Sequence, residues 1–165
     1  EQIPQVWTFL TERVGLDPER IYVTCFSGDA EHGIPKDEES AALWTGLFEA
    51  AGVSAGQVDV GTGENAAAAG TGGARIAFYS KKNWWCRGGK AEDMPIGEPG
   101  GPDTEMFYLF PDVRHDPAFG EHCHQNCDCG RFSPRWTTKS DMLKRLPASR
   151  LPSARPRGVS PSSLA

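Results

Sequence analysis

Six side chains able to bind a soft metal ion lie within fifteen residues in the second half of the chain. They are His115, His122, Cys123, His124, Cys127 and Cys129. Cysteine sulfur and histidine nitrogen are the usual ligands of zinc in four-coordinate protein sites. The Cys-x3-Cys-x-Cys spacing with flanking histidines therefore predicts a candidate zinc site, with ligands from Cys123, Cys127, Cys129 and His122.

Two interpretations of this cluster stay open. Two Cys-x-x-Cys pairs would be a strong zinc signal, whereas Cys-x-Cys is shorter than the usual chelating turn and one segment supplies every ligand. An unliganded polar turn between two strands explains the same residues. The chain has five cysteines, and this odd number with three packed together does not indicate a secreted disulfide framework. It favours a reducing cytoplasm.

Strands are the elements that must position this cluster. Residues 20–26 alternate two sets of largely apolar side chains, which is typical of a strand buried on both faces. Residues 75–79 and 104–110 predict two more strands. Because no crossover helix separates these last two, we expect them to be neighbours in an antiparallel sheet.

Two helices and one loop are also predicted. Residues 4–14 form a short amphipathic pattern that a proline begins and Gly15 ends. Residues 37–51 combine an acidic first turn with apolar residues at helical spacing, and Gly52 follows as a left-handed cap. Residues 56–73 hold six glycines and four consecutive alanines, which predicts a loop or an ordered insertion. The expected fold class is α+β.

Three further pieces carry a resemblance to a known family. They read ARIAFYSKKNWW at 74–85, GEPGGPDTEMFY at 97–108 and DCGRF at 128–132. Together and in this order they resemble alanyl-tRNA synthetase, a class II aminoacyl-tRNA synthetase. In this resemblance Trp85 takes the place of the tryptophan that lines the alanyl-adenylate site, where a flat indole can wall a small pocket and exclude water. A packed core tryptophan is the alternative.

The resemblance implies further substrate-contacting positions. Glu105 follows the Gly-Pro-rich turn and would orient polar groups of the pocket, unless backbone amides satisfy it. After Phe132 the family has the strand Leu-Glu-Ile-Trp-Asn, whose last residues reach the substrate. Trp136 matches its tryptophan, and Thr137 stands where the family has the alanine-contacting asparagine. Pro134 makes a central strand doubtful here, because proline removes a ladder hydrogen bond.

The resemblance also implies a function and its partners. Residues 1–136 would be part of the aminoacylation domain between motifs 2 and 3 of the class II fold, built on a partial antiparallel sheet with flanking helices. The substrates would be ATP with magnesium, L-alanine and tRNA(Ala), and the setting cytoplasmic. The ATP-binding arginines of the family are not recognisable in the chain, so we expect this polypeptide alone not to activate alanine. The family's familiar zinc site belongs to its editing domain.

Charge divides the chain into two parts. Residues 1–130 carry 9 Lys and Arg against 21 Asp and Glu, and residues 131–165 carry 8 against 1. The acidic part disfavours contact with an RNA backbone. Residues 137–165 are basic and rich in proline and serine, which predicts a disordered tail outside the family. An alternative function is a small zinc-stabilised module that binds RNA or protein. Hydrolase motifs and apolar runs of membrane-spanning length are absent from the sequence.

Overall fold

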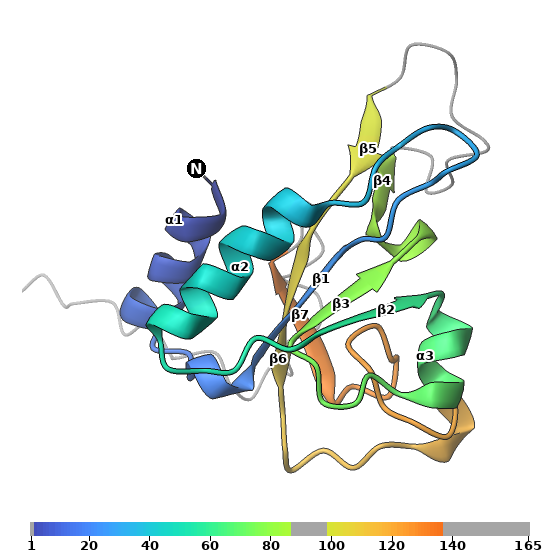
Figure 1. The fold of residues 1–165 in the computed structure, drawn as a ribbon. Coiled ribbons are helices and arrows are strands. Elements are labelled where there is room, and N and C mark those ends of the chain that lie inside the picture. The colour runs from blue at the N-terminus through green and yellow to red at the C-terminus, as the bar shows by residue number, and fades with distance from the viewer. Residues whose placement is uncertain (1, 87–98, 137–165) are drawn as a thin grey trace, which may run out of the picture.

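A mixed five-stranded sheet forms the centre of the protein. The computed structural model describes residues 2–86 and 99–136, and its larger sheet has the strand order β2-β3-β1-β6-β7 (Figure 1). The strands are β1 (Ile21–Phe26), β2 (Gln57–Gly61), β3 (Ile76–Tyr79), β6 (Glu105–Leu109) and β7 (Phe132–Trp136). A second, two-stranded sheet joins β4 (Trp84–Cys86) and β5 (Gly100–Pro102). Among the described strand pairs, β1–β6, β6–β7 and β4–β5 are antiparallel, and β1–β3 and β2–β3 are parallel. The α+β class is confirmed.

Helices cover both faces of the larger sheet. Helix α1 (Gln2–Thr8) runs on into a π-helical turn, η1 (Phe9–Arg13), and lies beside α2 (Glu38–Ala50), while α3 (Gly63–Ala69) lies on the other side of the sheet (Figure 1). The predicted start of α2 is confirmed, because the Asp37 carboxylate accepts a hydrogen bond from the Ser40 amide at 3.0 Å. Gly52 has a φ of 73°, as a left-handed cap requires.

The alternating side chains of the strands build two separate cores. The larger core packs α1, η1 and α2 on the sheet, and it contains Val6, Trp7, Leu10, Ile21, Val23, Cys25, Ala41, Trp44, Phe48, Val53, Ile76, Phe78 and Met106. The smaller core lies under α3 and contains Val60, Ala66, Ala77 and Tyr79. Neighbouring residues of β3 therefore point to opposite faces, as the period of two in a strand demands.

Two sequence-based expectations were wrong. Of the two forms expected for residues 56–73, a loop or an ordered insertion, the loop is wrong, since these residues contain β2 and α3. The Thr62 hydroxyl accepts a hydrogen bond from the Asn65 amide at 3.2 Å, and the alanine run that follows favours a helix. The strands β3 and β6 are not neighbours either, because β1 lies between them and pairs with both.

Strand β7 lies at the end of the described sheet and pairs with β6 alone among the described strands. Pro134 is aligned with Phe107, and the register shifts by one residue next to this position. An edge strand tolerates proline because one of its sides needs no ladder partner. Pro134 made a central strand doubtful, and in the described sheet β7 is an edge strand rather than a central one. The tail predicted for residues 137–165 lies outside the described residues.

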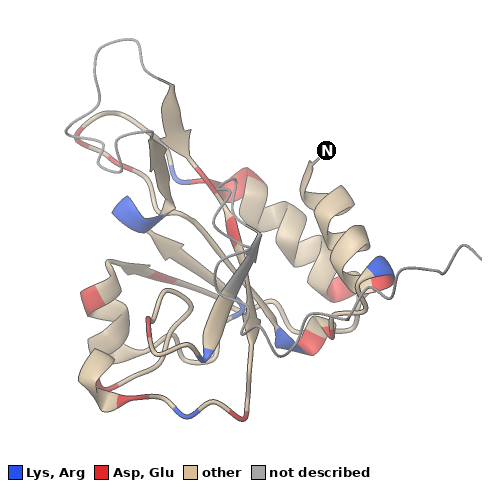
Figure 2. Cartoon of the chain, turned by 180° about the vertical axis from the view of Figure 1, so that it is seen from behind, with Lys and Arg blue, Asp and Glu red and all other residues tan. Residues whose placement is uncertain are grey.

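The described surface is predominantly acidic. Residues 2–86 and 99–136 carry 9 Lys and Arg against 17 Asp and Glu. Figure 2 shows the basic residues scattered along the chain rather than in one continuous stretch. Within these two ranges, no helix combines the length and the apolarity needed to cross a membrane.

Candidate metal centre and the Asn83 turn

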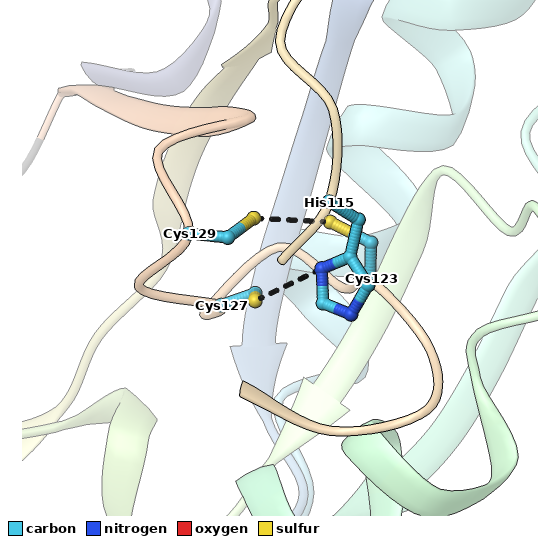
Figure 3. Close-up of side chains that lie close together, drawn as sticks. All are labelled: His115, Cys123, Cys127 and Cys129. Carbon is cyan, nitrogen blue, oxygen red and sulfur yellow. Dashed lines mark hydrogen bonds between the residues drawn. The ribbon is translucent and has the colours of Figure 1, made fainter. Parts of the chain in front are cut away.

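The long connection between β6 and β7 brings three cysteines and one histidine together. The side chains of His115, Cys123, Cys127 and Cys129 point toward one another (Figure 3), and their four potential ligand atoms all lie within 4.8 Å of one another. The Cys123 and Cys129 sulfurs are 3.6 Å apart, and Cys127 Sγ is 3.7 Å from His115 Nδ1. All the cysteines of the group are free thiols.

The ring of His115 is fixed by a backbone partner. Its Nε2 lies 2.9 Å from the Gly120 carbonyl oxygen, which can only accept a hydrogen bond. Nε2 therefore carries the proton, and Nδ1 faces the sulfurs. In the neutral imidazole, Nδ1 then has a free lone pair, which is the state that binds a metal.

Local turns place these four residues. Asp116 caps the short helix η5 (Pro117–Phe119) by accepting a hydrogen bond from the Ala118 amide at 2.9 Å, and Gly120 ends it with a φ of 122°. A second turn is closed by the Cys127 amide, which donates to the His124 carbonyl at 3.0 Å. The first turn returns the chain toward His115, and the second brings the cysteines back on one another.

The thiols of the group have very different proton affinities. Burial is the main reason why the pKa of Cys123 is raised to about 12, and its cysteine neighbours add to the effect. Burial would also raise the pKa of Cys129, but hydrogen bonds from the protonated form of His115, from the Arg131 amide and from the other two cysteines outweigh it and lower this pKa to about 7. Cys129 is thus the thiol of the group most readily converted to thiolate, the form that binds metals.

The three histidines of the segment have three different environments. His115 joins the sulfur group, whereas His122, the histidine expected as a ligand, lies outside it. The His122 ring lies close to Gly70, where an added Cβ would be 3.3 Å from its Cβ and Cγ. His124 is buried and hydrogen bonds through Nδ1 to the Tyr79 hydroxyl at 3.0 Å. Sequence spacing gives no signal for this choice, because His115 is eight residues away from the first cysteine.

A second cluster of polar contacts surrounds Asn83, the last residue of the short helical turn η3 (Lys81–Asn83) directly before β4. The Asn83 side-chain amide donates to Thr24 Oγ1 at 2.9 Å and to Asp103 Oδ1 at 3.2 Å. The Asp103 amide donates back to the Asn83 carbonyl at 3.0 Å. Asn83 itself is fully buried. These bonds join the end of β1, the turn before β4 and the turn before β6.

The expected substrate-contacting residues lie around this cluster, as far as they are described. Trp85 is half-buried in β4, where it is aligned with Gly101 of β5. Glu105 is half-buried at the first position of β6, opposite Thr24 of β1. Only the backbone of Trp136 is described, opposite Met106. Thr137 lies outside the described residues.

One open hollow of about 500 Å³ lies elsewhere on the described surface, in the loop between β1 and α2. It is lined by Ser27, Gly28, Asp29, Ala30, Gly33, Ile34, Pro35 and Lys36. These residues belong to none of the sequence motifs described above, and Trp85 is not part of the lining. Lys36 is held there by the Asp59 carboxylate at 2.8 Å.

The chain is similar to several proteins that are all named alanine–tRNA ligase. The alanine–tRNA ligase of Treponema denticola is 32% identical over 141 residues, which cover 82% of this chain and 18% of the ligase. That of Treponema pallidum is 31% identical over 141 residues, with 82% and 17% covered. The cytoplasmic alanine–tRNA ligase of Dictyostelium discoideum is 50% identical over 108 residues, with 66% and 8% covered. No family model matches the chain. The matched region spans less than a fifth of the length of these relatives.

Proposed function

Because the chain contains an alanyl-tRNA synthetase-related region, we propose that residues 1–136 are part of the aminoacylation domain of an alanine–tRNA ligase. The hydrogen-bonded junction at Asn83 carries this proposal. Its bonds to Thr24 and Asp103 hold the Asn-Trp-Trp turn beside the Gly-Pro-rich turn, although the two turns are distant in sequence. These are two of the three pieces on which the resemblance rests.

In this proposal the junction supports one wall of the alanyl-adenylate pocket. Trp85 is half-buried, so part of its indole is available to pack against a bound adenylate. Glu105 begins β6 two residues after Asp103 and would orient polar groups of the pocket. By the resemblance, Trp136 and Thr137 are also assigned to substrate contact in this proposal.

The reaction proposed for the whole ligase joins the alanine carboxylate to the α-phosphate of ATP and releases pyrophosphate with its magnesium ion. It then transfers alanine from the adenylate to tRNA(Ala) and releases AMP. Clamping arginines stabilise the charge that develops on the leaving pyrophosphate, and none is recognisable in these 165 residues. We therefore propose that this polypeptide alone does not activate alanine. A cytoplasmic setting is part of the proposal, and the Dictyostelium relative carries that word in its name.

Two assays test these statements. Alanine-dependent ATP–pyrophosphate exchange is expected to stay at background with the 165-residue chain, and turnover above background would overturn the proposed incompleteness. Calorimetric titration with a non-hydrolysable alanyl-adenylate analogue tests the pocket wall itself. Loss of an aromatic contact is worth about 1–1.5 kcal/mol, so Trp85→Ala should weaken binding roughly five- to tenfold.

Phe119→Ala is the matched control for this titration, because Phe119 is 45% exposed and lies in the connection between β6 and β7, away from the Asn83 junction. It should bind the analogue as the wild type does. Equal affinities of the wild type and Trp85→Ala would show that Trp85 is a packing residue. No binding by the wild type would refute the proposed pocket wall.

A second candidate function is a small zinc-stabilised module that binds RNA or protein. The Cys/His group supports it, whereas the excess of acidic residues in the described part of the chain argues against RNA as the partner. Stoichiometric zinc together with salt-sensitive RNA binding, and no affinity for the adenylate analogue, would favour this module over the ligase fragment.

A further inference from the structure

We propose that His115, Cys123, Cys127 and Cys129 bind one structural zinc ion. The ligand atoms are already close to the corners of a tetrahedron. With Zn–S near 2.3 Å and Zn–N near 2.0 Å, a tetrahedral site has a sulfur-to-sulfur edge of about 3.8 Å and a sulfur-to-nitrogen edge of about 3.5 Å. Two of the six edges of the group measure 3.6 Å and 3.7 Å, and the ligand atoms of the other pairs lie within 4.8 Å of one another. This inference does not rest on the proposed ligase function.

The chemistry of the four ligands selects zinc. Three thiolates and one imidazole nitrogen are a standard donor set for tetrahedral zinc, and soft sulfur ligands exclude magnesium and calcium. The Gly120 carbonyl fixes the His115 tautomer by accepting from Nε2, and such a backbone partner accompanies most metal-binding histidines. A disulfide does not explain the cluster, because sulfur atoms 3.6 Å apart are far beyond the bond length of about 2.05 Å.

All four positions of the site are filled by protein side chains, so the role is structural. A catalytic zinc ion keeps one position open for water or substrate, and this group leaves none. Three thiolates around a doubly charged ion give the site one net negative charge.

The site would tie down the long connection between β6 and β7. The first ligand follows β6 closely and the last precedes β7, so the ion joins both ends of the connection. Between these ends the connection contacts the α3 side of the sheet. The His122 amide donates to the Ala67 carbonyl at 2.8 Å, and the Gln125 side chain donates to the Ala74 carbonyl at 3.1 Å. Zinc would therefore stabilise the cover over the smaller core.

The first test measures the metal on the wild-type 165-residue chain, purified with a reductant. Mass spectrometry of the metal content is expected to give one zinc per chain. Replacement by cobalt should give the visible absorption of tetrahedral Co²⁺ and a sulfur-to-metal charge-transfer band. Less than a tenth of an equivalent of zinc after reconstitution, or octahedral cobalt spectra, would refute the site without any variant.

The second test identifies the ligands. Cys127→Ser and His115→Ala should each weaken zinc binding by more than the roughly 10- to 100-fold that loss of an outer-shell partner causes. His122→Ala is the matched control, because it removes a histidine of the same segment that lies outside the group, and it should retain one zinc per chain. Loss of zinc in His122→Ala with retention in His115→Ala would overturn the assignment.

Discussion

The Thr104 hydroxyl joins α2, β1 and the beginning of β6, and its removal should destabilise the fold measurably. Thr104 Oγ1 accepts a hydrogen bond from Trp44 Nε1 at 2.9 Å and donates to the Thr24 carbonyl at 2.7 Å. Trp44 is 2% exposed and Thr24 is fully buried, so water cannot replace the lost partner. Thr104→Val keeps the shape of the side chain and removes these two bonds, together with the weaker contact between Thr104 Oγ1 and Cys25 Sγ at 3.6 Å.

The expected loss of stability follows from the two buried groups, Trp44 Nε1 and the Thr24 carbonyl, that lose their hydrogen-bond partner. A buried donor left without an acceptor costs about 1–3 kcal/mol, and loss of the bond to the Thr24 carbonyl adds about 1 kcal/mol. Thr104→Val should therefore lower the free energy of unfolding by about 2–4 kcal/mol. For a chain of this size each kcal/mol corresponds to roughly 2–4 °C in Tm. Urea denaturation followed by tryptophan fluorescence measures the difference.

Thr104→Ser is the matched control, because serine keeps the hydroxyl and loses one methyl group. Burial of a methyl is worth about 0.8 kcal/mol at most, so the serine variant should remain close to the wild type. A double-mutant cycle with Trp44→Phe isolates the bond between the two side chains. If the valine variant unfolds within 0.5 kcal/mol of the wild type, the hydroxyl does not hold these elements together.

Three further changes test the packing and the metal site. Gly120→Ala should cost more than about 1–3 kcal/mol, because the new Cβ would lie 2.6 Å from Ala67 Cβ and the residue has a φ of 122°. Gly15→Ala is the control, since Gly15 also has a positive φ, of 77°, but its new Cβ would have nothing within 4 Å. Equal Tm values for the two variants would contradict the close approach. Phe48→Ala should lose about 3–5 kcal/mol in urea denaturation and Phe119→Ala less than about 0.5 kcal/mol, because Phe48 is fully buried and Phe119 is 45% exposed; a reversed order would exclude the packing of α2 on the sheet. With free zinc a thousandfold above its Kd, the bound ion would stabilise the folded state by roughly 4 kcal/mol. Removal of zinc by a chelator should then lower Tm by the corresponding amount. An unchanged Tm after chelation would contradict a structural ion.

Local patterns were sufficient for the elements whose cues lie within a few residues. The alternation in residues 20–26 predicted β1, and Asp37 with Gly52 bounded α2, because strand period and helix caps are properties of neighbouring residues. The glycine-rich composition of residues 56–73 hid a second set of cues. Thr62 is a good helix cap and the alanines after it are strong helix formers. The six glycines nevertheless led to the prediction of a loop.

The sequence by itself determined which residue types are present for chemistry: three cysteines at close spacing, three histidines near them, and the Asn-Trp-Trp and Gly-Pro-rich turns of the resemblance. Only the tertiary structure decided how they combine. Insertion of β1 between β3 and β6 brings Thr24 to Asn83, since sheet order depends on burial of both faces rather than on chain order. Folding of the β6–β7 connection brings His115 rather than His122 to the three cysteines, because its turns return the chain toward His115, and no spacing along the chain records where those turns meet.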